Sequence, residues 1–147
     1  MQRKKSKATF LNVPNAKVGI VVAKFNSDIT SKLLASAQKT LALCGVKKGN
    51  IAVVEVAGAA ELPHGLQRLA LKKRFDCLVA LGCIIKGETP HFDYVCKMAQ
   101  EGVLRVSLDY VVPIGFGVVT VNNLKQANAR IYVGGEAALA ALGLTKI

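Results

Sequence analysis

The sequence predicts a single α/β domain of three layers, in which helices cover both faces of a four-stranded parallel sheet. First, strand-like and helical segments alternate along the chain, an order that excludes helical bundles and β-sandwiches. Second, the strand-like segments are short apolar runs, as expected where both faces of a sheet are buried. Third, 147 residues that are 52% hydrophobic suffice for one domain with a substantial core but not for two.

The first half of the chain contains two strand–helix pairs. Residues 17–23 (KVGIVVA) form a β-branched apolar run, which is typical of a buried strand. From Asp28 the apolar residues recur with helical spacing, and Gly45 is the predicted stop of this helix. A second strand is predicted over residues 51–57, and a second helical stripe over residues 62–70 has a proline in its first turn.

The third strand is predicted over residues 76–85 (DCLVALGCII), the most apolar segment of the chain. A helix is expected to open near Thr89 and Pro90, because threonine is a common cap and proline suits a first turn. This helix extends towards Leu108.

The last part of the chain completes the alternation. Residues 113–121 are predicted as a fourth strand and residues 123–132 as a helix. Gly134 and Gly135 are expected to break that helix before a last, alanine-rich helix over residues 136–144.

The chain is basic throughout, with a formal net charge of +11. Residues 1–16 contain four of the cations and are predicted to be a mostly disordered basic tail with weak strand potential, followed by one domain over residues 17–147. No apolar run approaches the roughly 18 residues of a membrane helix. Polar residues also interrupt any signal-peptide core after the basic start.

The four cysteines are predicted to be buried, reduced thiols of a cytoplasmic protein. Their spacings match no zinc-binding pattern, and three of them lie in apolar segments. With only two histidines in the chain, a dedicated metal site is not expected.

The position of a ligand site follows from the predicted sheet, because ligands of open α/β sheets bind outside the carboxyl ends of the strands. Four segments follow those ends: residues 24–26, 58–61, 86–91 and 120–123. Residues that carry chemistry are therefore expected in these segments.

The segment Gly87-Glu88-Thr89-Pro90-His91 is the most informative of the four. A glycine and the free N–H groups of a helix start are suited to an anion such as phosphate. His91, within the first turn, could accept or relay a proton near neutral pH. On spacing alone, a simple helix cap with a surface histidine explains the segment at least as well.

Three further features have both a binding and a structural interpretation. Glu61, after the open backbone of residues 58–60, could bind hydroxyls or ring N–H groups, or favour its own helix start. Phe25 could stack on a planar heterocycle, or close the edge of the core. Arg130 could clamp a phosphate, or satisfy a helix C-terminus.

Residues 18–142 strongly resemble the lumazine synthase family. The resemblance rests on Phe25-Asn26, Gly58-Ala59, Glu61-Leu62-Pro63, the run 80–95 with GETPHFDYV at its end, Phe116-Gly117-Val118, Thr120, Gln126-Ala127, Arg130 and Glu136-Ala137-Ala138. It implies a flavodoxin-like fold and the condensation of 5-amino-6-ribitylamino-uracil with 3,4-dihydroxy-2-butanone 4-phosphate. The products would be 6,7-dimethyl-8-ribityllumazine, phosphate and water, with no cofactor.

The same resemblance implies a role for each site residue. His91 would move protons as the catalytic residue. The uracil and its ribityl chain would be bound by Phe25, Asn26, Gly58, Ala59, Ala60, Glu61, Ile84, Ile85 and Phe116. Phosphate would be bound by Gly87, Glu88, Thr89 and Arg130. Phe116 and Arg130 would reach in from the adjacent subunit of a pentameric ring, and riboflavin synthase is a further implied partner.

The chain departs from the family pattern at three positions. Alanine stands at Ala57 and Ala60, where the family usually has proline and a bulky residue, so the ribityl side of the pocket is expected to be wider. The loop after Arg130 is shorter than usual, and Val133 falls where the family has a lysine. The charge keeps one rival interpretation open, a non-catalytic scaffold or nucleic-acid-binding protein, against which the scarcity of aromatic residues and of RNA-binding signatures argues.

Overall fold

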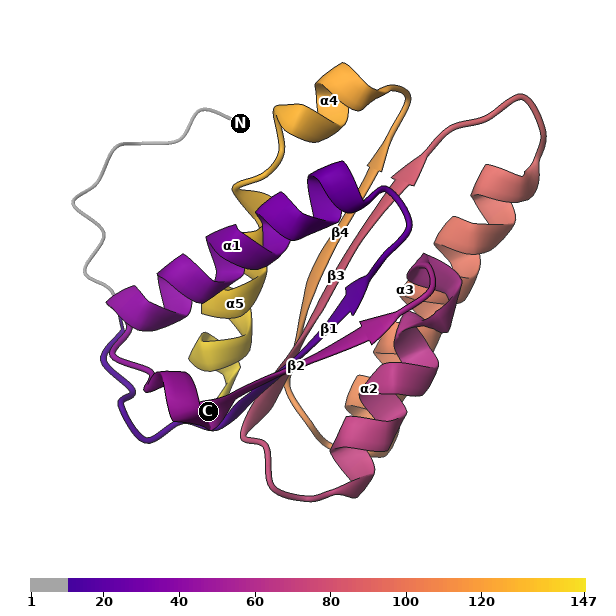
Figure 1. Ribbon diagram of the computed structural model, residues 1–147. Coiled ribbons are helices and arrows are strands. Elements are labelled where there is room, and N and C mark those ends of the chain that lie inside the picture. Colours follow the sequence, from indigo (N-terminus) through magenta and orange to yellow (C-terminus); the bar gives the residue numbers. More distant parts are fainter. Residues whose placement is uncertain (1–10) are drawn as a thin grey trace.

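The strands of the sheet all run in the same direction. The computed structural model describes residues 11–147, and in it the sheet has the order β2-β1-β3-β4 (Figure 1). The strands are β1 (Val18–Ala23), β2 (Ile51–Val56), β3 (Cys77–Ile85) and β4 (Ile114–Val121). Val18 lies opposite Ile51 on one side and Cys77 on the other, so three strands begin at the same level. The four predicted strands are confirmed to within a residue at each end.

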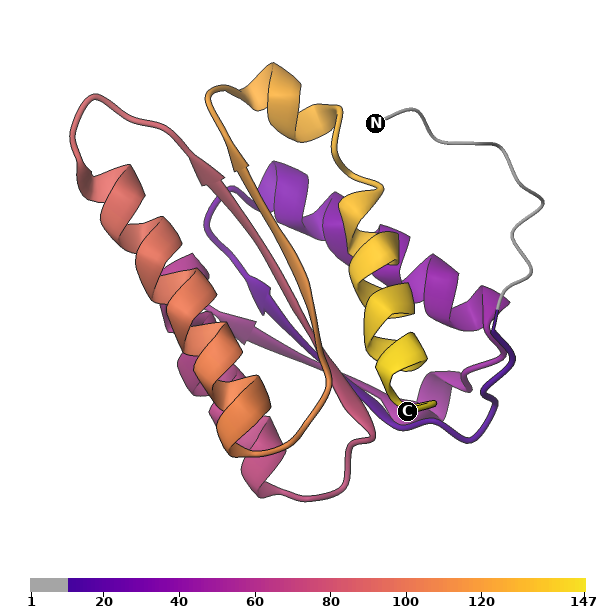
Figure 2. The same cartoon turned by 180° about the vertical axis from the view of Figure 1, so that it is seen from behind.

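Helices cover both faces of this sheet, which confirms the three-layer, flavodoxin-like architecture. The α-helices are α1 (Ser27–Leu43), α2 (Leu62–Leu71), α3 (His91–Asp109), α4 (Leu124–Asn128) and α5 (Val133–Leu144). Two short 3-10 helices, η1 (Lys48–Asn50) and η2 (Ala59–Glu61), flank β2. Figures 1 and 2 show α1 and α5 together on one face, with α2 and α3 on the other.

The central strands β1 and β3 supply side chains to two apolar clusters, one on each face. All six residues of β1 and eight of the nine in β3 are buried, which explains their continuous apolar sequences. One cluster joins β1 and β3 to α1 and α5, and the other joins them to α2 and α3. This packing holds the carboxyl ends of β1 and β3 in fixed relation to each other.

The last helix begins earlier than the sequence predicts. Gly134 and Gly135 do not break a helix but lie inside α5, which starts at Val133. A Cβ on Gly134 would overlap the backbone carbonyl of Leu33, and the amide of Gly135 donates to Oγ of Ser36 at 3.0 Å. The two glycines therefore allow α5 to pack directly against α1.

The preceding helix is shorter than predicted. α4 ends at Asn128 because the next residues turn through i to i+3 hydrogen bonds, Arg130 N to Ala127 O at 3.0 Å and Val133 N to Arg130 O at 3.1 Å. It begins one residue later than predicted, because the side chain of Asn123 caps the helix by accepting from the amide of Gln126 at 2.9 Å.

Part of the predicted tail packs against the domain. Val13 is buried, and its amide donates to the carbonyl of Cys44 at 2.8 Å, beside the end of α1. Residues 11–16 form no strand, and residues 1–10 of the predicted tail lie outside the described residues. No helix within residues 11–147 is both long and apolar enough to cross a membrane.

The four cysteines are free thiols. Three are buried and the fourth, Cys96, is half-buried. Burial raises the pKa of Cys77 to about 12, with a smaller contribution from the carboxylate of Asp76. These thiols therefore stay protonated at neutral pH, as expected for structural rather than reactive cysteines.

Candidate active site

A cavity of about 450 Å³ opens at the carboxyl ends of β1, β2 and β3, where the sheet topology predicts a ligand site. It is lined by Phe25, Asn26, Ala57, Gly58, Ala59, Ala60, Glu61, Cys83, Ile84, Ile85, Gly87, Thr89, His91, Phe92 and Val95. Eleven of the fourteen site residues expected from the sequence are among them, brought together from three separate loops and the end of β3.

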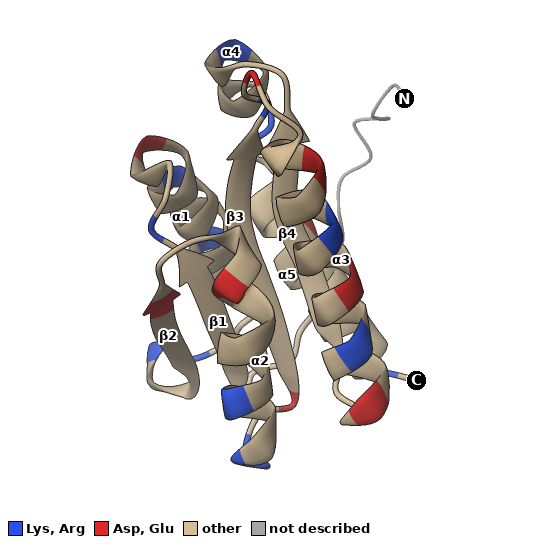
Figure 3. Cartoon of the chain, turned by 90° about the vertical axis from the view of Figure 1, so that its right-hand side faces the viewer, with Lys and Arg blue, Asp and Glu red and all other residues tan. Residues whose placement is uncertain are grey.

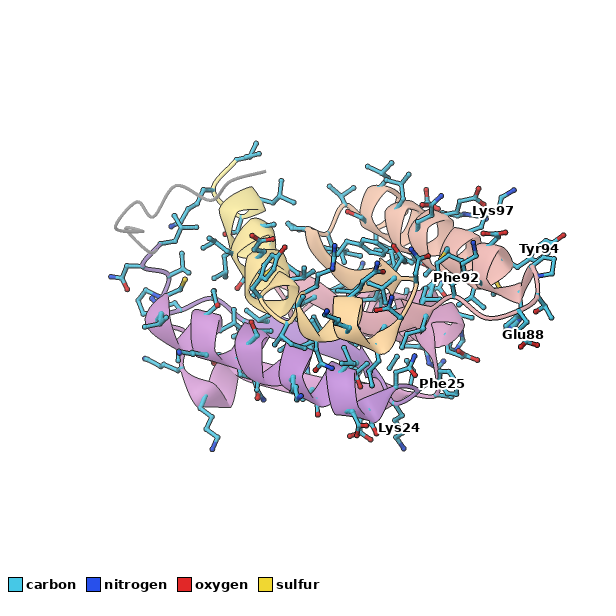
Figure 4. All side chains as sticks on the ribbon, turned by 90° about the horizontal axis from the view of Figure 1, so that it is seen from above. Lys24, Phe25, Glu88, Phe92, Tyr94 and Lys97 are labelled. Atoms are coloured by element: carbon cyan, nitrogen blue, oxygen red, sulfur yellow. The ribbon has the colours of Figure 1, made fainter. Side chains whose placement is uncertain are left out.

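The loop after β1 holds Phe25 at the mouth of this cavity. The amide of Phe25 donates to the carbonyl of Ala57 at 2.9 Å, which fixes its backbone against the loop after β2. The ring itself is 72% exposed, so it does not close the edge of the core. Figure 4 shows Phe25 near the loop that joins β1 to α1, with Phe92 on the opposite side at the start of α3.

Asn26 joins the carboxyl ends of two strands. Its backbone is left-handed (φ 62°), a conformation that asparagine tolerates better than most residues. Its Nδ2 donates to the carbonyl oxygen of Cys83 in β3 at 2.8 Å. This bond occupies part of the amide that the family resemblance assigns to substrate, and it holds the Phe25 loop in place beside Ile84.

The loop after β2 supplies the carboxylate of the cavity. The amide of Glu61 donates to the carbonyl of Gly58 at 3.1 Å, closing the short helix η2. A Cβ on Gly58 would lie 3.2 Å from Oε2 of Glu61 and 4.0 Å from Cβ of Phe25. The carboxylate of Glu61 therefore lies close against the backbone of Gly58, where a side chain would crowd it.

The loop after β3 brings Thr89 and His91 to the far side of the cavity. Oγ1 of Thr89 accepts from the amide of His91 at 3.4 Å. The helix begins one residue later than predicted, because Pro90 precedes rather than occupies its first position. No heavy atom lies within 4 Å of a Cβ built on Gly87, so this backbone is open to a ligand.

Three expected site residues do not line the cavity of the single chain. Glu88 is exposed, and Figure 4 places it at the outer side of its loop. Phe116 is 43% exposed in the edge strand β4. Nη1 of Arg130 donates to the carbonyl oxygen of Gln126 in its own helix region at 2.9 Å.

Three apolar residues complete the cavity and were not assigned to it from the sequence. Phe92 and Val95 face it from the first turns of α3, and their spacing of three residues is the signal that could have identified them. Cys83 lines it from the end of β3, and burial raises the pKa of its thiol to about 11. At neutral pH Cys83 is therefore a small neutral wall residue.

The charge on the cavity wall restricts the ligand. Among the described residues that line it, Glu61 is the only carboxylate, and none is a lysine or arginine. The cavity is therefore suited to a planar heterocycle with hydroxyl groups, and the countercharge for a phosphate must come from outside this wall. Within residues 11–147, no group of three or more His, Cys, Asp or Glu is arranged to hold a metal ion.

Comparison with known proteins agrees with this geometry. Residues 15–147 match the family described as 6,7-dimethyl-8-ribityllumazine synthase. A protein of Parabacteroides distasonis named 6,7-dimethyl-8-ribityllumazine synthase is 44% identical over 128 residues, which cover 85% of this chain and 80% of that protein.

Proposed function

This chain belongs to the 6,7-dimethyl-8-ribityllumazine synthase family, and we infer that the cavity at the strand ends is its active site. The enzyme condenses 5-amino-6-ribitylamino-uracil with 3,4-dihydroxy-2-butanone 4-phosphate, and it releases 6,7-dimethyl-8-ribityllumazine, phosphate and water. The observation that carries the assignment of the site is the convergence of the Phe25, Glu61 and His91 loops on one cavity. A non-catalytic scaffold is not favoured.

The uracil occupies the side of the cavity between Phe25 and the end of β3. The exposed ring of Phe25 stacks on the pyrimidine, and Ile84 and Ile85 form the opposite apolar wall. The ribityl hydroxyls donate to the carboxylate of Glu61, which lies close to the backbone of Gly58. Asn26 holds the Phe25 loop through its bond to Cys83, and the remaining amide atoms of its side chain can bind the uracil.

The phosphate of the second substrate binds at the opposite side, against Gly87 and Thr89. The open backbone at Gly87 and the hydroxyl of Thr89 offer donors next to the start of α3. His91, in the first helical turn, removes protons from the attacking amine as the imine forms and returns one as water departs. The same imidazole is near the phosphate when the phosphate leaves.

The missing countercharge leads us to a site shared between two copies of the chain. The wall holds no cation, whereas Arg130 and Phe116 are exposed elsewhere on the surface. Large apolar side chains are also exposed on and beside α3, including Tyr94, Leu104 and Leu108. A ring in which each copy offers Arg130 and Phe116 to its neighbour would cover these surfaces, and we assign the pentamer of the family resemblance.

The wider setting is also part of the proposal. Free, buried thiols fit a cytoplasmic enzyme. Because the product is a lumazine, a riboflavin synthase is the partner that would consume it.

The test of this function is incubation of the purified protein with both substrates. Formation of the lumazine chromophore together with equimolar phosphate, well above the uncatalysed rate, is the expected result. Product at the uncatalysed rate from correctly folded protein would overturn the assignment.

A further inference from the structure

The end of the sheet opposite the active site carries a concentration of positive charge. We propose that this surface binds the phosphate backbone of a nucleic acid, without reading its sequence, while the enzyme remains active. The basic patch consists of Lys17, Lys47, Lys48, Lys72, Lys73 and Arg74, all of them exposed. Figure 3 shows Lys and Arg gathered at the lower end of α2 and around the start of β2.

The parallel sheet is what assembles the basic patch. Lys17 precedes β1, Lys47 and Lys48 precede β2, and the run 72–74 precedes β3. Because the strands are parallel and Val18 pairs with the first residues of β2 and β3, these three basic segments meet at the end of the sheet where the strands begin. The sequence separates the three segments by about 25 to 30 residues, so the run 72–74 is visible in the sequence but the patch as a whole is not.

A groove of about 310 Å³ lies within the patch. It is lined by Lys17 and Arg74 together with Gly49, Asn50, Ile51, Ala52 and Phe75. The guanidinium of Arg74 stacks over the ring of Phe75 at 5.1 Å from its centre, which orders the arginine at the groove. A hollow flanked by cations fits a ridge of phosphates better than it fits a flat bilayer surface.

The patch cations are available for a ligand. The ion pairs formed between described residues are Lys24–Glu55, Lys97–Glu101 and Arg105–Asp109, all outside the patch. The carboxylate of Asp76, next to Arg74 and Phe75 in the sequence, already accepts from the backbone amide of Lys17 at 2.8 Å. With Asp76 counted, the patch carries +5 of the net +7 of residues 11–147.

The make-up and spread of the patch are compatible with a row of phosphates. Five of the six cations are lysines, which bind phosphate as point charges, and they come from three segments at one end of the sheet. Lys73 adopts a left-handed backbone (φ 53°), a conformation that asparagine tolerates better than most residues. Because these contacts are to the backbone of a nucleic acid, they need no stacking aromatics.

The test is anisotropy of a labelled single-stranded oligonucleotide titrated with the full-length protein across a series of salt concentrations. With about four or five phosphates contacted, log K should fall against log salt with a slope of about −3. The patch variant Lys47→Gln/Lys48→Gln/Lys72→Gln/Lys73→Asn should bind at least about tenfold more weakly at low salt, with a slope nearer −1. Asparagine is used at position 73 because it tolerates the left-handed backbone.

The control variant Lys97→Gln/Lys125→Gln removes two charges from α3 and α4, away from the patch, and should bind about as native. Both variants should form lumazine at the native rate, which separates this proposal from the proposed function. An unchanged affinity in the patch variant, or an equal loss in the control, would overturn the proposal. So would equal or tighter binding of poly-glutamate or of phosphatidylserine vesicles in the same assay, since either would identify a different partner.

Discussion

Replacing Phe25 with alanine separates the binding role of its ring from a packing role. The ring is 72% exposed, so the chain itself buries about a quarter of it, and its removal should lower the free energy of unfolding by less than about 1 kcal/mol. A bound pyrimidine would cover most of the remainder. Lost burial and stacking together amount to about 2 kcal/mol, or about thirtyfold in affinity for the uracil substrate.

The assay is calorimetric titration of 5-amino-6-ribitylamino-uracil into native and variant protein, with denaturant unfolding of both. Phe25→Leu is the matched control: it keeps an apolar side chain but loses the planar face, so we expect an intermediate loss of about twofold to tenfold. Native affinity in Phe25→Ala, or a loss of more than about 2 kcal/mol in its stability, would refute stacking. Such a result would restore the interpretation of Phe25 as a core-edge residue.

Three further changes test other parts of the account. His91→Ala should lower kcat by about tenfold to a thousandfold without changing assembly, because general acid–base catalysis contributes up to a few decades in rate. Thr89→Ala should mainly raise KM for the phosphate substrate. Steady-state kinetics of both variants distinguishes the two roles, and a native kcat in His91→Ala would remove His91 from the mechanism. Gly134→Ala should destabilise the fold by about 1–3 kcal/mol, because the new Cβ would overlap the carbonyl of Leu33. Gly143→Ala should stabilise α5 by up to about 1 kcal/mol, because the space around its Cβ is open. Equal effects of the two changes in thermal melts would contradict the packing of α5 on α1. The Cys77 thiol keeps its proton up to its pKa of about 12 in the folded protein, whereas an unfolded thiol loses its proton near pH 9. Above pH 9 the unfolded state therefore binds fewer protons, and the free energy of unfolding should fall by about 1.4 kcal/mol per pH unit. Cys77→Ala should show a shallower decline in unfolding experiments from pH 8 to 11.

The fold was predictable because the strands carry strong local signals. The short, β-branched apolar runs 17–23 and 76–85 are typical of buried strands, and their alternation with helical stripes then indicated a parallel sheet. The same reasoning placed the ligand site at the carboxyl ends before any motif was considered. Gly134 and Gly135 were misread because a glycine pair has the same local signal whether it ends a helix or permits close packing. Only the contact with α1 distinguishes the two cases.

The cavity was predictable where loops carry its residues, and less so where long-range contacts decide. Phe25, Glu61 and His91 follow strand ends and were found from that position. The bond from Asn26 to the carbonyl of Cys83 joins residues 57 apart, and no local pattern encodes it. The basic patch has the same origin: charges that are unremarkable in three separate segments become one surface through the strand register.

The central claim is that the active site needs His91 of one copy and Arg130 of its neighbour. The direct measurement is to unfold the His91→Ala and Arg130→Ala variants together in equal amounts, reassemble them, confirm mixed rings by mass, and measure lumazine formation. Random placement leaves about a quarter of the interfaces with both residues intact, so activity should rise well above either parent, towards about a quarter of the identically treated native protein. Activity no higher than the mean of the two parents in proven mixed rings would place both residues in a site within one chain and contradict the shared site.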